Sequence, residues 1–115
     1  MKAITGESYE IRMDDNHSTV FFKGALRLSG VADYLPILDL LKETLVNPTN
    51  PVVLDLKELD FLNSSGITML SRFVIEARDR AGINLFFIAS ESIVWHARSL
   101  KNLQRLMPAL VIHLT

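Results

Sequence analysis

The sequence predicts an α/β domain in which a mixed β-sheet is covered by α-helices. Residues 52–56 and 85–89 are short, almost wholly apolar runs, as is typical of buried strands in a parallel sheet. Helical periodicity before, between and after these runs supplies the crossover that each parallel connection needs. At the amino end, turn residues 14–17 join two segments rich in β-formers and predict an antiparallel hairpin. We expect residues 1–115 to form one domain, because this length supports a single core.

The strands and helices are expected in the order ββαβαβαβ. Apolar residues at three- and four-residue spacings mark the helices, and residues 47–51, Gly82 and Pro108 mark where the helices end. Residues 24–30 are expected to connect the second strand to the first helix. The predicted strands cover residues 9–13, 19–23, 52–56, 85–89 and 110–114. The predicted helices cover about residues 31–46, 64–81 and 92–107.

Composition and charge exclude several classes of function. Apolar residues make up 49% of the chain and charged residues 22%, as in a soluble globular protein. With 12 basic and 13 acidic side chains the formal net charge is -1, so neither nucleic acid nor an anionic membrane surface is an expected partner. The absence of cysteine excludes disulfides and thiol catalysis. No signal peptide and no apolar run of membrane-spanning length is present, so we expect a cytoplasmic location.

Residues 63–66, Asn-Ser-Ser-Gly, stand where a predicted strand gives way to a helix. Hydroxyl groups at such a junction lie beside free backbone N–H groups and the positive end of the helix dipole. One interpretation is structural: a serine caps the helix, which contributes on the order of 1 kcal/mol, and Gly66 permits a tight turn. In the other, one hydroxyl caps while its neighbour is exposed and can be phosphorylated, which adds about two negative charges. The residues alone leave both interpretations open.

Two apolar residues on the same predicted helix also have two interpretations. Met69 and Phe73 lie one turn apart at the flank of the inward-facing stripe. They are either part of a broad core stripe or a partly exposed apolar edge beside the serines. An exposed edge would form the centre of a protein-binding patch.

Carboxylates near two strand ends permit a rival interpretation as a phospho-accepting receiver domain. Asp14 and Asp15 follow the first predicted strand, and Asp55 lies near the end of a buried one. A receiver needs a helix after the first pair and a lysine after residues 85–89, whereas this chain has a predicted strand and no lysine there. We therefore interpret Asp14 and Asp15 as turn residues and Asp55 as structural.

Neither a metal, a cofactor nor an enzyme active site is expected. His17, His96 and His113 are scattered over a predicted turn, helix and strand, without the convergent ligands that metal binding needs. His96 lies on the apolar face of the last helix, so we predict a hydrogen-bonded core histidine. No set of nucleophile, base and orienting group is visible, which argues against an enzyme.

The segment LDLKELDFLNSSGITML, residues 54–70, together with the predicted element order, resembles the STAS family of anti-sigma factor antagonists and sulfate-transporter domains. Members of that family typically carry the pattern D-F-[ILM]-D-S-[ST]-G-[ILV], which residues 60–67 match except at Asn63. The resemblance implies a single STAS-like domain. In the antagonists, the serine after the acidic residue is phosphorylated by an anti-sigma factor that is also a kinase, and a phosphatase reverses the reaction. The resemblance therefore implies Ser64 as the phospho-acceptor, with Ser65 as second choice and cap.

The resemblance implies a regulatory switch that binds a protein partner, not an enzyme. The unphosphorylated form would bind the anti-sigma factor, a serine kinase, and a serine phosphatase would restore that form. Because Asn63 replaces the acidic residue, a constitutive STAS scaffold that is not controlled by phosphorylation is the alternative. Arg27 stands where the family often has an acidic pattern, which reverses the charge of a segment that commonly faces the partner. The expected contact surface consists of Gly24, Arg27, Asn63, Ser64, Ser65, Gly66, Met69, Arg72 and Phe73.

Overall fold

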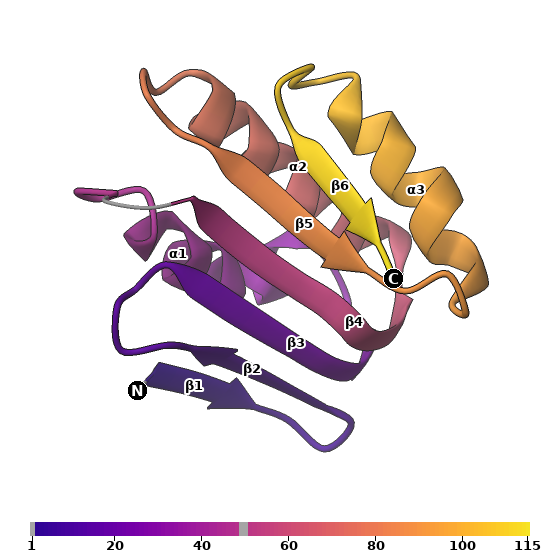
Figure 1. Cartoon of the computed structure of the whole chain (residues 1–115). Coiled ribbons are helices and arrows are strands. Elements are labelled where there is room, and N and C mark those ends of the chain that lie inside the picture. The colour runs from indigo at the N-terminus through magenta and orange to yellow at the C-terminus, as the bar shows by residue number, and fades with distance from the viewer. Residues whose placement is uncertain (1, 49–50) are drawn as a thin grey trace.

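The fold is a six-stranded mixed sheet with its strands in sequential order, β1-β2-β3-β4-β5-β6 (Figure 1). The computed structural model describes residues 2–48 and 51–115. Strand β2 is antiparallel to both β1 and β3, and β3 to β6 are parallel. The strands are β1 (Lys2–Thr5), β2 (Tyr9–Met13), β3 (Thr19–Leu26), β4 (Val52–Leu62), β5 (Leu85–Ala89) and β6 (Val111–Leu114). The helices are the 3₁₀ turn η1 (Val31–Tyr34), α1 (Leu35–Glu43), α2 (Ser64–Arg78) and α3 (Val94–Gln104).

The observed order confirms the α/β prediction and adds one strand. Strand β1 pairs with β2 over four residues and has only a weak β pattern of its own, so pairing rather than sequence pattern defines it. The predicted helices start later or end sooner than expected, and η1 replaces the first turn of the first one. Of the predicted helix stop at residues 47–51, positions 49 and 50 lie outside the described residues.

Strands β3 and β4 are longer than predicted, and the pairing between them is irregular. The register between them shifts between Phe21 and Lys23 and again between Gly24 and Ala25. Gly24 has φ +95°, and a Cβ there would collide with the carbonyl oxygen of Ser8. Only glycine adopts this backbone conformation readily. At each register shift β4 carries one residue more than β3, so the bulges lie in β4, and residues 24–26, predicted as part of a connecting segment, continue β3.

The helices all lie on one face of the sheet. Right-handed crossovers between strands in sequential order place each helix on the same side, and Figure 1 shows α1 and α2 behind the sheet with α3 next to them. The buried residues of the strands alternate toward that side, as Leu54 and Leu56 in β4 and Leu85 and Phe87 in β5 show. The predicted helical cover is therefore present on one face, and the opposite face carries half-buried side chains such as Phe21.

The carboxyl ends of the parallel strands meet at one edge of the sheet, where α2 and α3 begin (Figure 1). This edge positions the residues that the sequence singled out. No helix in residues 2–48 and 51–115 combines the length and apolarity that crossing a membrane requires.

Candidate functional site at the start of helix α2

Asn63 caps helix α2, and neither serine does. Its backbone is extended, and its Oδ1 accepts a hydrogen bond from the Gly66 N–H at 3.0 Å. Asparagine is among the best N-cap residues, so the helix is capped one position before Ser64. The interpretation that Ser64 or Ser65 supplies the cap is wrong.

The side chain of Asn63 also joins two other segments to the start of α2. The phenol of Tyr34 in η1 donates to Oδ1 at 2.7 Å, and Nδ2 donates to the carbonyl oxygen of Leu28 at 2.8 Å. The Asn63 N–H donates to the carbonyl oxygen of Leu26 at 3.2 Å. A carboxylate accepts but does not donate, so the acidic residue usual in the family would leave Leu28 unpaired. The departure at Asn63 therefore has a structural reason in this chain.

Tyr34 is held as a neutral donor at the centre of this network. Its side chain is fully buried. Burial raises the pKa of Tyr34, the backbone of Leu28 opposes this by lowering it, and the charge of Tyr9 contributes a smaller increase. The phenol therefore keeps its proton for the bond to Asn63.

The side chains of Ser64 and Ser65 do not cap the helix. Ser64 is exposed in the first turn of α2, and Ser65 is half-buried. Within residues 2–48 and 51–115 neither hydroxyl takes part in a hydrogen bond. The Ser64 hydroxyl is therefore available to a partner.

Three of the residues predicted to contact a partner are buried. Met69 and Phe73 are each 0% exposed and belong to the core between α2 and the sheet. The interpretation of an exposed apolar edge at these positions is wrong, because the inward stripe of α2 is wide enough to include both. Gly66 is buried as well, and a Cβ there would meet the side chain of Leu62 and, at 3.0 Å, the hydroxyl of Tyr34. These residues shape the site from within.

The structure brings Arg27 to the site and leaves Arg72 and Gly24 at its margins. The Arg27 guanidinium lies over the ring of Phe61, with 4.5 Å between its Cζ and the ring centroid. Arg72 is exposed two turns along α2 from Ser64. Gly24 is half-buried in β3, where its φ of +95° and the nearby carbonyl oxygen of Ser8 require a glycine.

Two exposed apolar side chains that the sequence interpretation missed lie at the end of β4 and at the start of α3. Phe61 is 39% exposed at the end of β4, and Val94 is 93% exposed at the start of α3. The indole Nε1 of Trp95 donates to the carbonyl oxygen of Asp60 at 2.8 Å and so ties the two elements together. A shallow hollow is lined there by Asp60, Ile93, Val94, Trp95, Arg98 and Ser99. The signal in the sequence was the apolar run at residues 93–95, at the start of a helix whose buried residues exclude Val94.

His96 confirms the prediction of a hydrogen-bonded core histidine. It is fully buried. The Ser90 N–H donates to its Nδ1 at 3.0 Å, and its Nε2, 2.9 Å from the Leu59 carbonyl oxygen, must therefore carry the proton and donate. Burial lowers the pKa of His96, while the Leu59 carbonyl and the charge of Asp60 oppose the shift. This neutral ring fixes the start of α3 against β4.

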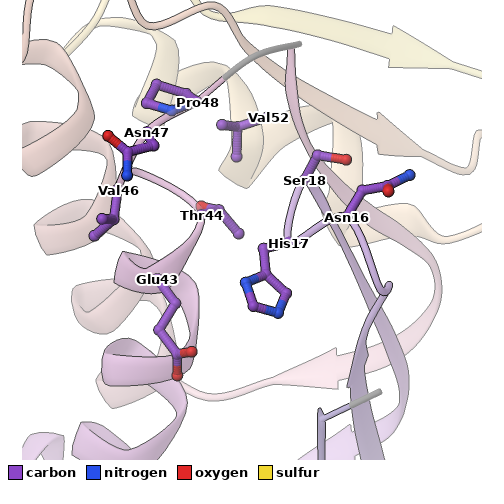
Figure 2. A pocket seen from close by; sticks show the side chains of 9 residues that line it. All are labelled: Asn16, His17, Ser18, Glu43, Thr44, Val46, Asn47, Pro48 and Val52. Atoms are coloured by element: carbon purple, nitrogen blue, oxygen red, sulfur yellow. The ribbon is translucent and has the colours of Figure 1, made fainter.

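A pocket lies at the other end of the parallel strands, beside the start of β4 (Figure 2). It has a volume of about 470 Å³ between the β2–β3 turn and the end of α1, and His17 and Glu43 face it from these two sides. In that turn Asp14 Oδ1 accepts from the N–H groups of Ser18 and Thr19, which confirms its interpretation as a turn residue. No cluster of potential metal ligands occurs in the part of the chain that the structure describes.

The family model of the STAS domain matches residues 12–110. The chain therefore belongs to the STAS domain family. No curated protein matches the sequence significantly.

Two solved structures share the fold over 100% of this chain and 100% of theirs, each with 15% sequence identity. One is a chain in the crystal structure of the diguanylate cyclase SiaD in complex with its activator SiaC from Pseudomonas aeruginosa, with a TM-score of 0.77. The other is SiaC of Pseudomonas aeruginosa, with a TM-score of 0.73.

Proposed function

We propose that the protein is a non-catalytic, cytoplasmic regulator that binds a protein partner through the edge of the sheet where α2 and α3 begin. The surface at this edge combines exposed hydroxyl, cationic and apolar groups from Ser64, Arg27, Phe61 and Val94. Aromatic and arginine side chains are enriched among the residues that dominate binding energies at interfaces. The buried Met69 and Phe73 are no longer part of the proposed contact surface.

Binding is proposed to be controlled by phosphorylation of Ser64. The observation that carries this proposal is that Asn63 supplies the cap, so the exposed Ser64 hydroxyl is free. The Ser64 oxygen would attack the γ-phosphorus of ATP bound to a partner kinase, ADP would leave, and a base on the kinase would take the hydroxyl proton. A phosphate here adds about two negative charges at the positive end of a helix dipole, so the fold tolerates it while the surface changes. The half-buried Ser65 is the second choice.

The partners proposed from the family pattern are an anti-sigma factor with serine kinase activity and a serine phosphatase. A second candidate partner is a diguanylate cyclase, which the likeness to a chain of the SiaD–SiaC complex supports. Arg27 favours a partner with an acidic patch in either case, because complementary charge selects partners.

The alternative is a constitutive scaffold that docks the same partner without phosphorylation. The amide of Asn63 supports it, because this residue is explained by the bonds to Leu28 and Tyr34 without any role in kinase recognition.

Phosphopeptide mass spectrometry of the protein from its native cells separates these proposals. Switch control predicts phosphate on Ser64, its loss in Ser64→Ala, and its retention in the matched control Ser65→Ala. It also predicts that Ser64→Asp captures the kinase partner at least tenfold more weakly than the parent protein. A chain that carries no phosphate while kinases are active, and a Ser64→Asp variant that binds as well as the parent, would contradict the switch and favour the scaffold.

A further inference from the structure

We propose that the guanidinium of Arg27 binds a phosphate on Ser64 within the same chain, and that its movement to the phosphate uncovers Phe61. This inference rests on the proposed phosphorylation of Ser64. Arg27 would bind the phosphate only in the phosphorylated protein, and its movement would change the exposed apolar surface.

The backbone on both sides of Arg27 is fixed to the residue that precedes Ser64. Leu26 accepts a hydrogen bond from the Asn63 N–H at 3.2 Å, and Leu28 accepts one from its Nδ2 at 2.8 Å. Leu26 also pairs with Leu62 in the parallel register of β3 and β4. Arg27 therefore lies beside residue 63, one position from Ser64.

Standard backbone dimensions place Arg27 within reach of the phosphate. Neighbouring strands lie about 4.8 Å apart and consecutive Cα atoms about 3.8 Å apart, so the Cα atoms of Arg27 and Ser64 are separated by at most about 9 Å. An extended arginine and a phosphoserine together span such a gap. Arg72 lies eight residues after Ser64 along α2, a rise of about 12 Å at 1.5 Å per residue. Its guanidinium is therefore less well placed to bind the phosphate.

Arg27 is free to change partners. It is exposed and makes no ion pair within residues 2–48 and 51–115; its contact is with the ring of Phe61 at 4.5 Å. An exposed cation–π contact is weak, whereas a guanidinium binds phosphate through two charge-assisted hydrogen bonds. The Arg27 guanidinium therefore leaves the Phe61 ring and binds the phosphate.

The loss of Arg27 exposes the ring of Phe61, which is already 39% exposed with the guanidinium over it. Phe61 follows Asp60, whose carbonyl oxygen accepts the Trp95 indole bond. The uncovered ring would add exposed apolar area at the end of β4, the strand to which the Trp95 indole is bonded. Phosphorylation would replace a cation at this position with an aromatic face, which suits a different partner.

The test uses the full chain with phosphoserine inserted at position 64 during translation, so that no kinase is needed. A phosphorus NMR titration measures the second pKa of the phosphate in this protein, in Arg27→Gln and in the matched control Arg72→Gln. A bound guanidinium favours the dianion, so we expect the pKa to be lower by about one pH unit in the parent and in Arg72→Gln than in Arg27→Gln. Equal pKa values in the parent and Arg27→Gln would overturn the proposal.

A second measurement follows Phe61 itself. The nuclear Overhauser contact between the Arg27 side chain and the Phe61 ring should be present without phosphate and lost with it. Persistence of this contact in the phosphorylated protein would contradict the movement. Because the phosphate is inserted directly, these outcomes are independent of whether a cellular kinase modifies Ser64, which the phosphopeptide measurement decides.

Discussion

The phenol of Tyr34 donates a hydrogen bond to Oδ1 of Asn63 at 2.7 Å and thereby links η1 to the cap of α2. Oδ1 accepts a second bond from Gly66, so the amide oxygen is fully used, and Nδ2 is used by Leu28. The residue that replaces the family's acidic position is therefore a junction between three segments. Its identity determines how the β3–η1 segment, which carries Arg27, is held beside Ser64.

We predict that Asn63→Asp destabilises the protein. The carboxylate keeps the two acceptor bonds, but it faces the Leu28 carbonyl oxygen without a donor. An unsatisfied polar group costs about 1–3 kcal/mol, and the favourable charge at the helix N-terminus returns about 0.3–1 kcal/mol. Urea unfolding should show a net loss of about 1–2 kcal/mol. Asn84→Asp, at an exposed position, is the control and should leave the free energy of unfolding nearly unchanged. An Asn63→Asp protein as stable as the parent would contradict the role assigned to Nδ2.

Gly24→Ala is expected to be far more damaging than Gly30→Ala. Gly24 has φ +95°, and an added Cβ would collide with the Ser8 carbonyl oxygen and lie 3.0 Å from the Tyr9 Cα, which are both backbone atoms. Nothing lies within 4 Å of a Cβ added at Gly30. Forcing a side chain into such a position costs about 1–3 kcal/mol for the backbone strain alone. Thermal unfolding of the two variants measures this, and a similar melting temperature for both would show that position 24 tolerates a side chain.

Ser64→Asp should leave the fold intact and stabilise it slightly. An acidic side chain in the first turn of α2 interacts with the positive end of the helix dipole, which contributes about 0.3–1 kcal/mol at low salt. The gain should shrink in high salt because an exposed charge is screened. Asn102→Asp, at an exposed position in the last turn of α3, is the opposite control and should be slightly destabilising. A loss of stability at position 64 would mean that the Ser64 hydroxyl has a structural task.

The order of strands and helices was predictable because parallel strands in this chain are unusually apolar. The strand at residues 85–89 was predicted with the bounds observed for β5, since its neighbours Asn84 and Ser90 end the apolar run on both sides. Strand β1 was missed because its pairing with β2, not its composition, keeps it in the sheet. The length of β4 was missed because its two extra residues opposite β3 break the alternation that sequence patterns detect.

The position of the strand-to-helix junction was predictable from the sequence, but the roles of its residues were not. Its place at a strand-to-helix junction followed from residues 63–66, and His96 followed from its position on an apolar face. The cap was assigned to a serine because a local pattern does not reveal that Asn63 also reaches Tyr34 and Leu28, 29 and 35 residues earlier. The burial of Met69 depends likewise on how far α2 is rotated against the sheet, which helical spacing alone leaves open.

Acidification below pH of about 6.5 is expected to destabilise the protein through His96. Its pKa in the folded state is lowered from the ordinary value of 6.5, chiefly by burial. Below that value the unfolded chain binds a proton that the folded protein excludes, so the stability is complete above pH of about 6.5 and decreases as the pH falls toward the folded pKa. The physical cause is the Nδ1 atom, which accepts from the Ser90 N–H and cannot do so once protonated.

Urea unfolding at pH 7.5 and 5.5 measures the effect. The parent protein should lose stability between these pH values, with a loss of up to about 1.4 kcal/mol for each unit by which the pKa is lowered. His96→Gln should be less stable at pH 7.5 but should lose less on acidification, whereas the exposed control His17→Gln should behave as the parent does. If His96→Gln showed the same pH dependence as the parent, a group other than His96 would be responsible. The result bears on the proposed partner surface, because His96 holds the start of α3, and with it Trp95 and Val94, against β4.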